Sequence, residues 1–155
     1  MSLPFLVSCS MPEPLLFECS DGRFQLVDQM PLSPFMSGYG YLLVEKKLAA
    51  FLKQVKVERV SFSPAIVFSA ATGEEFTTHV RIRVSQFFRG NELLDLDASG
   101  YRMLTLSDQY YFVSQELKAA LQSSAFRYLQ FSEGLSGFAA VAAYPLIQRD
   151  ALRRP

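Results

Sequence analysis

The spacing of apolar residues changes twice within residues 41–63. Residues 41–44 form a short continuous apolar run, which is typical of a buried strand. Four apolar residues then recur at the helical spacing i, i+3, i+4 and i+7, and these are Leu48, Phe51, Leu52 and Val55. We therefore expect a helix over residues 45–55. A second strand should follow, containing Val57, Val60 and Phe62 and closing at Pro64.

The same pattern returns later in the chain. A shift of 69 residues places residues 41–63 onto residues 110–132 without a gap, and 7 of the 23 aligned pairs are identical. The second helical face is kept as Leu117, Ala120 and Leu121, and Ser114 is a suitable N-cap. We interpret the ungapped register as an internal duplication of one strand–helix–strand unit.

The remainder of the chain is expected to be mostly extended. Strand candidates, with a hairpin turn at Asp21-Gly22, are residues 6–9, 15–17, 24–27, 65–68, 79–84 and 103–106. Tyr39 and Tyr41 are expected to pack at a turn. Residues 134–147 are apolar and small, and their pattern leaves helix and strand both open, while residues 149–155 should fray.

Strict alternation across residues 79–84 predicts one apolar and one polar face. Val80, Ile82 and Val84 should face a core, and His79, Arg81 and Arg83 should face water or a partner. The chain of 155 residues fits a single domain, residues 1–155. The predicted fold is α+β, with a mostly antiparallel sheet and two duplicated strand–helix–strand units.

Charge and hydropathy exclude some classes of partner. The 15 basic and 15 acidic residues cancel, so the basic excess of a nucleic-acid-binding protein is missing. The longest segments without charged residues, 29–44 and 134–148, are too short for a membrane-spanning helix. Residues 6–9 resemble a bacterial lipoprotein cleavage box, but no basic or long apolar segment precedes Cys9, so a first strand and a cytoplasmic location are expected.

The inventory of reactive side chains points away from catalysis. His79 is the only histidine, and Cys9 and Cys19 are the only cysteines, expected as free thiols. These three residues are fewer than the four ligands of a structural zinc site and are scattered along the chain, so we expect no metal, and we also expect no cofactor and no enzyme activity. Glu92, Asp95 and Asp97 fit either a solvated strand face or an acidic partner-binding edge, and they lack the spacing of a calcium loop.

Residues 111–121, Tyr-Phe-Val-Ser-Gln-Glu-Leu-Lys-Ala-Ala-Leu, run into Tyr-Leu-Gln-Phe at residues 128–131. This stretch resembles a bacterial immunity-protein family from polymorphic toxin systems, in which a strand ending in Val-Ser leads into an amphipathic helix and a strand that closes on an aromatic. Residues 94–99 are similar to that family's Asp-rich, Ser-ended segment, and residues 62–64 to its Phe-x-Pro. The resemblance covers residues 41–132, and Glu45 departs from it where the second unit has Ser114.

The resemblance implies a non-enzymatic protein that binds and blocks a cognate toxin made by the same cell. Aromatic and arginine anchors carry most of the energy at such interfaces, and charges steer partner choice. The candidate partner-binding residues are Arg81, Arg83, Glu92, Asp95 and Asp97. Two alternatives stay open: an adaptor or chaperone for a secreted effector, and a small enzyme that uses Cys9, Cys19 or His79.

Overall fold

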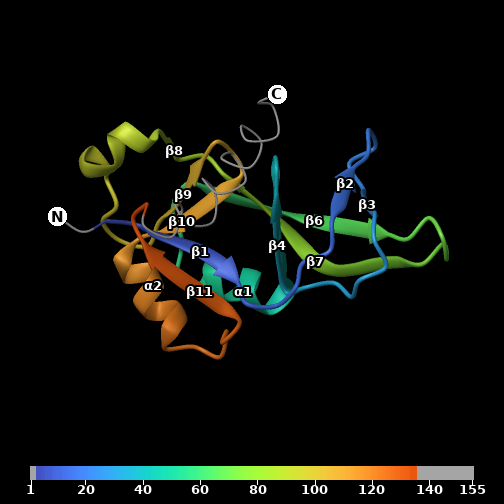
Figure 1. The fold of residues 1–155 in the computed structure, drawn as a ribbon. Helices are drawn as coiled ribbons and strands as arrows, with labels where there is room; N and C mark the ends of the chain where they lie inside the picture. The colour runs from blue at the N-terminus through green and yellow to red at the C-terminus, as the bar shows by residue number, and fades with distance from the viewer. Residues whose placement is uncertain (1–2, 136–155) are drawn as a thin grey trace, which may run out of the picture.

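The computed structural model describes residues 3–135, which form two mixed sheets with helices of α and 3-10 type (Figure 1). Sheet A has the order β11 (Leu129–Glu133), β1 (Phe5–Cys9), β10 (Tyr110–Val113), β9 (Met103–Leu106), β8 (Phe87–Phe88). Sheet B has the order β2 (Leu16–Glu18), β3 (Phe24–Leu26), β6 (Val60–Phe68), β7 (Glu75–Val84), β5 (Tyr41–Glu45), β4 (Phe35–Gly38). The helices are α1 (Lys46–Gln54), α2 (Gln115–Gln122) and the 3-10 helix η1 (Gly90–Asp95). The described part of the chain therefore belongs to the α+β class.

Each of the two predicted strand–helix–strand segments forms such a unit, as β5–α1–β6 and as β10–α2–β11. In both units a third strand lies between the two outer strands. β7 lies between β5 and β6, and β1 lies between β10 and β11. Each inserted strand is antiparallel to both neighbours, so the two outer strands of each unit run parallel to one another.

The main core lies between the sheets and receives side chains from both helices. On α1 these are Leu48 and Leu52, and on α2 they are Leu117 and Leu121. The Phe51 and Phe126 rings meet edge to face with centroids 5.5 Å apart. Burial of this apolar surface is the dominant favourable term in folding, so the two helical faces read from the sequence hold the two sheets together.

Alternating residues of the same strands reach other clusters. Leu42 and Val44 of β5 face the main core, whereas Tyr41 and Leu43 join a second cluster beneath the β2–β3 hairpin. Val7 and Leu6 of β1 divide in the same way between the main core and a third cluster near β8. Sheet B is thus covered on both faces around β5, and polar residues of the adjacent β7 are therefore buried.

The two helices begin differently. The Ser114 hydroxyl accepts a hydrogen bond from the Leu117 N–H at 3.3 Å, so the predicted N-cap of α2 is confirmed. Glu45 precedes α1 without any side-chain cap bond. α1 spans residues 46–54 against the predicted 45–55, and Tyr41 is buried as expected.

Several extended segments differ from expectation. β6 continues through Pro64 to Phe68. Proline has no N–H to donate, but β3 pairs only with Val67 and Phe68, so no neighbouring strand lies on one side of Pro64 and no hydrogen bond is lost there. β4 was not anticipated. Tyr39 is 80% exposed rather than packed. Residues 94–97 do not form a strand, since η1 occupies Gly90–Asp95.

The first strand and the Asp21-Gly22 hairpin are confirmed as β1 and as the antiparallel pair β2–β3. The helix-or-strand question for residues 134–147 falls mostly outside the described residues, as does the fraying expected of residues 149–155. Within residues 3–135, no helix combines the length and the hydropathy needed to cross a membrane.

Candidate functional site

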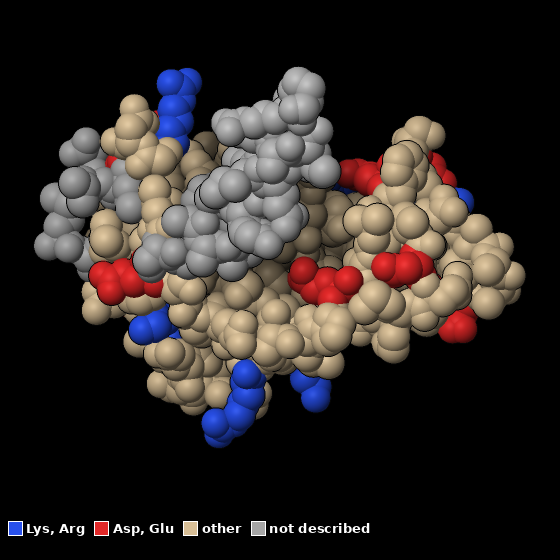
Figure 2. Space-filling model, in the orientation of Figure 1, with Lys and Arg blue, Asp and Glu red and all other residues tan. Residues whose placement is uncertain are grey.

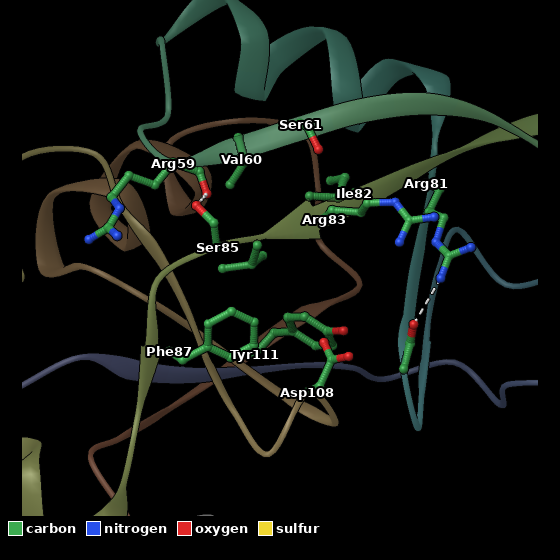
Figure 3. Close-up of a pocket in the computed structure, with 12 residues that line it drawn as sticks. Arg59, Val60, Ser61, Arg81, Ile82, Arg83, Ser85, Phe87, Asp108 and Tyr111 are labelled. Atoms are coloured by element: carbon green, nitrogen blue, oxygen red, sulfur yellow. Dashed lines mark hydrogen bonds between the residues drawn. The ribbon is translucent and has the colours of Figure 1, made fainter.

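A pocket of about 490 Å³ opens where β7 of sheet B approaches β8 and the β9–β10 turn of sheet A (Figure 3). Its charged lining residues are Arg59, Arg81, Arg83 and Asp108. Phe87 and Tyr111 supply aromatic surface on the sheet A side. A volume of a few hundred Å³ lined by apolar surface and a few convergent polar groups is the usual form of a ligand site.

Arg81 is buried, with a side chain only 8% exposed, so the expectation that it faces water is wrong. Its two terminal nitrogens donate to the Glu18 carboxylate at 2.6 and 3.2 Å, and one of them also donates to the Gly40 carbonyl at 3.0 Å. The guanidinium also lies 5.2 Å from the centre of the Phe24 ring. Arg81 therefore ties β2, the β4–β5 turn and β7 together, and Glu18 compensates its charge.

Arg83 and Arg59 are both exposed, and neither side chain makes a hydrogen bond or ion pair with the described residues. Arg83 extends from β7 toward the Arg81 guanidinium (Figure 3). Arg59 precedes β6 and has a φ of 59°, a backbone angle that residues other than glycine rarely adopt. The Ser85 N–H and hydroxyl both donate to the Arg59 carbonyl at 2.9 Å and fix its backbone.

Asp108 is the acidic member of the pocket. It lies in the three-residue β9–β10 turn, residues 107–109, where Ser107 and Asp108 have φ values of 58° and 51°. The Gly40 N–H donates to the Asp108 carbonyl at 2.8 Å and joins this turn to the β4–β5 turn. Burial, and then the neighbouring Asp108 carboxylate, raise the pKa of Tyr111, so that phenol stays protonated at neutral pH.

The acidic residues predicted as partner contacts lie elsewhere. Glu92 accepts a hydrogen bond from the Arg89 N–H at 3.1 Å and stabilises the start of η1, and Asp95 is the last residue of that helix. Asp97 is exposed and follows η1. Neither Glu92 nor Asp97 lines the pocket, whereas Arg81 and Arg83 both do.

Asp97 belongs to a structural ion-pair cluster around Arg102. The Arg102 guanidinium lies 3.0 Å from the Asp97 carboxylate and 3.2 Å from that of Glu58. It also donates to the Gln86 side chain at 3.2 Å. Hydrogen bonds from Ser99, followed by the charge of Arg102, lower the pKa of Asp97. This carboxylate is therefore occupied by groups of its own chain.

His79 is buried, with 7% of its surface exposed, so its expected place on a solvated face is also wrong. Its Nε2–H donates to the Ser33 carbonyl at 2.8 Å, and the Thr78 hydroxyl donates to its Nδ1 at 2.9 Å. Burial is the main cause that lowers the pKa of His79. These contacts describe a neutral imidazole that holds the segment before β4 against β7.

We expect the His79→Gln variant to lose less stability than the wild type when pH falls from about 7.5 to about 5. The pKa of His79 is lower in the folded than in the unfolded state, so the unfolded chain takes up a proton first. The stability that neutral His79 supports is therefore complete above its ordinary pKa and is lost as pH falls below it. Urea unfolding at a series of pH values measures this difference.

Glu13 changes the free energy of unfolding with pH in the opposite direction to His79. Burial raises the pKa of its carboxyl to about 7 despite a hydrogen bond from the Ser37 N–H, so its contribution to stability grows as pH falls. That contribution is present in both proteins and cancels in the comparison. Parallel stability curves for wild type and His79→Gln across this range would contradict the assignment.

The described residues contain no cluster of three or more His, Cys, Asp or Glu side chains that could hold a metal ion. Both cysteines are free thiols, and the Cys9 thiol lies 3.3 Å from the Ser33 hydroxyl. On the face of the molecule in Figure 2, charged side chains are scattered among larger neutral areas.

A second hollow, of about 530 Å³, lies between α1 and the β6–β7 hairpin. Its lining is mainly apolar, with Lys46 and Lys53 as its cations. The Lys53 ammonium sits 5.0 Å from the centre of the Phe62 ring, so part of this charge is already engaged. We therefore regard the arginine pocket as the stronger candidate site.

The arrangement defines an α+β protein with a cationic pocket at the junction of its two sheets. No family model matches the chain, and neither the curated proteins nor the solved structures contain a significant match to it. Sequence reasoning missed Arg59, Phe87, Asp108 and Tyr111 as pocket residues. The one local signal was the polar Ser107-Asp108 pair between two strands, which is typical of a tight turn.

Proposed function

We propose that this chain is a cytoplasmic immunity protein that binds a cognate bacterial toxin and neutralises it by covering the toxin's active site. The observation that carries the proposal is that two arginines of the pocket, Arg59 and Arg83, have no side-chain partner among the described residues. The same pocket contains the exposed ring of Phe87, which is 61% accessible. Arginine and aromatic side chains dominate the binding energy of protein interfaces, particularly where they are grouped around a pocket.

The architecture suits inhibition by occlusion. The pocket walls come from β6, β7 and β10 and from two turns, which the main core and several backbone hydrogen bonds hold together. A binding surface on such elements loses little conformational freedom when it associates, which favours tight binding. The function requires no catalytic group in the chain, only a stiff complementary surface.

The proposal includes an internal duplication of residues 41–63 and 110–132. Several positions support it, because residues 69 apart begin equivalent elements: Tyr41 and Tyr110 open β5 and β10, and Val60 and Leu129 open β6 and β11. Leu48 and Leu117 are equivalent and both buried. Mostly antiparallel sheets are part of the same proposal, supported by seven antiparallel and two parallel strand pairings among residues 3–135.

Co-expression with the toxin from the adjacent gene tests the function. We expect cells that express both proteins to grow, and the two proteins to elute together on gel filtration, because an occluding inhibitor must form a stable complex. The His79→Gln variant should protect equally, since this imidazole is engaged within the fold. Unrelieved killing with no complex would refute the proposal. Altered secretion of the toxin without protection would instead favour the adaptor alternative.

A further inference from the structure

The charges of the arginine pocket do not balance within the chain. Glu18 forms a two-point ion pair with Arg81, which leaves Arg83 and Arg59 without a carboxylate partner among the described residues. Among the residues that the structure describes, Asp108 is the only acidic one that lines the pocket, and no ion pair joins it to either arginine. Two uncompensated guanidinium groups therefore face a pocket with one carboxylate, which favours an acidic ligand.

A buried hydrogen-bond donor of Arg81 also favours an acidic ligand. The Arg81 Nε–H is inaccessible to solvent and has no hydrogen-bond partner in the described part of the chain. Buried donors are rarely left unsatisfied, because the missing bond lowers the stability of the fold. An acceptor supplied from outside the chain would relieve this cost.

The two unpaired arginines extend in different directions. In Figure 3 the Arg59 side chain points toward the β8 side, while Arg83 points toward Arg81 and the β4–β5 turn. The pocket also has apolar surface, most of all the exposed Phe87 ring. A small inorganic anion would leave that apolar surface uncovered, whereas an extended peptide places alternate side chains along it.

Hydrogen bonds hold two residues of the pocket in a strained backbone conformation. Arg59 and Asp108 both have positive φ values and both line the pocket, and each is held by hydrogen bonds to its carbonyl oxygen. A residue other than glycine in this conformation costs on the order of 1 kcal/mol or more. Strained residues of this kind cluster at binding sites, where the surrounding structure fixes their positions.

We propose that the pocket binds an extended acidic segment of the partner protein, in which carboxylates at positions i and i+4 flank an apolar side chain at position i+2, so that all three side chains lie on one face. One carboxylate pairs with Arg83 and the other with Arg59, and the apolar side chain covers Phe87. The inference rests on the proposed function for the statement that the partner is a protein toxin, but the preference of the pocket for this chemistry can be tested without the toxin.

The first experiment follows the arginine Nε–Hε groups by NMR in low-salt buffer. The probe is acetyl-Glu-Ser-Leu-Ser-Glu-amide, and acetyl-Gln-Ser-Leu-Ser-Gln-amide and inorganic phosphate are the comparison ligands. We expect saturable shifts at Arg59, Arg81 and Arg83 with the acidic peptide and none with the neutral one. Equal shifts with phosphate would overturn the peptide assignment in favour of a small-anion site, and the absence of shifts would overturn the proposal altogether.

The second experiment uses variants whose effects have opposite signs. Arg59→Gln and Arg83→Gln should each weaken binding of the acidic peptide about tenfold, because each removes one charge-assisted hydrogen bond. Asp108→Asn should tighten it roughly two- to fivefold by removing a repelling carboxylate. Arg127→Gln, which removes an exposed arginine outside the pocket, is the matched control and should have no effect. Equal affinities for all four variants would contradict the proposal.

The same variants separate this inference from the proposed function. If the wild type protects cells from the toxin and the Arg59→Gln/Arg83→Gln double variant protects equally well, the pocket inference fails and the immunity function stands. If the wild type does not protect but the acidic peptide binds as expected, the immunity function fails and the pocket retains its predicted chemistry.

Discussion

Replacing Leu117 by alanine is expected to lower the free energy of unfolding by about 2–5 kcal/mol. Leu117 is fully buried in the main core and lies in the first turn of α2, where Ser114 also caps the helix. The substitution removes apolar surface and leaves a cavity between α2 and the sheets. Urea unfolding followed by circular dichroism measures the change.

A matched comparison separates burial from helix propensity. Gln122→Ala lies at the end of the same helix on an exposed position, and its effect should stay within about 0.5 kcal/mol. Leu48→Ala, at the equivalent position of α1, should cost about as much as Leu117→Ala because Leu48 is 2% exposed in the same core. A cost below about 1 kcal/mol for Leu117→Ala would mean that the main core does not lie where α2 meets the sheets.

Arg81→Ala is expected to cost about 2–4 kcal/mol, whereas Arg83→Ala, two residues along the same strand, should cost less than about 1 kcal/mol. Removal of Arg81 leaves the Glu18 carboxylate and the Gly40 carbonyl without their donor and opens space beside Phe24. We place the cost below that of a fully buried pair, because the Glu18 side chain is 38% exposed and solvent screens it.

The pair of variants also separates a structural from a binding role. Arg83 makes no side-chain bond within the described residues, so its loss should affect binding and leave the unfolding midpoint nearly unchanged. Glu18→Gln should destabilise in the same direction as Arg81→Ala, since it leaves a buried guanidinium uncompensated. Equal stability losses for Arg81→Ala and Arg83→Ala would contradict this division of roles.

Local patterns predicted the elements that neighbouring residues dictate. The spacing of Leu48 and Leu52 identified α1, and Ser114 marked the start of α2, because helix periodicity and capping depend on residues within one or two turns. The Asp21-Gly22 turn was found for the same reason: Gly22 has a φ of 89°, which glycine adopts without strain.

Alternation failed where both faces of a strand are covered. The polar residues His79 and Arg81 were expected to face water, because a strand with one polar face usually lies at a surface. β7 instead has a neighbouring strand on each side, and its polar face meets Ser33 and Glu18 from distant parts of the chain. Only Arg83 keeps the predicted exposure.

The sequence by itself determined the α+β class, both helices, most strands and the two strand–helix–strand segments, because each is encoded by the pattern of residues near one another in the chain. The tertiary structure alone decided which arginine is bound within the fold and which is left free, since Glu18 and Arg81 are 63 positions apart. It also assembled the pocket, because Asp108 of sheet A joins Arg59 and Arg83 of sheet B only when the two sheets pack together, and no local pattern encodes that packing.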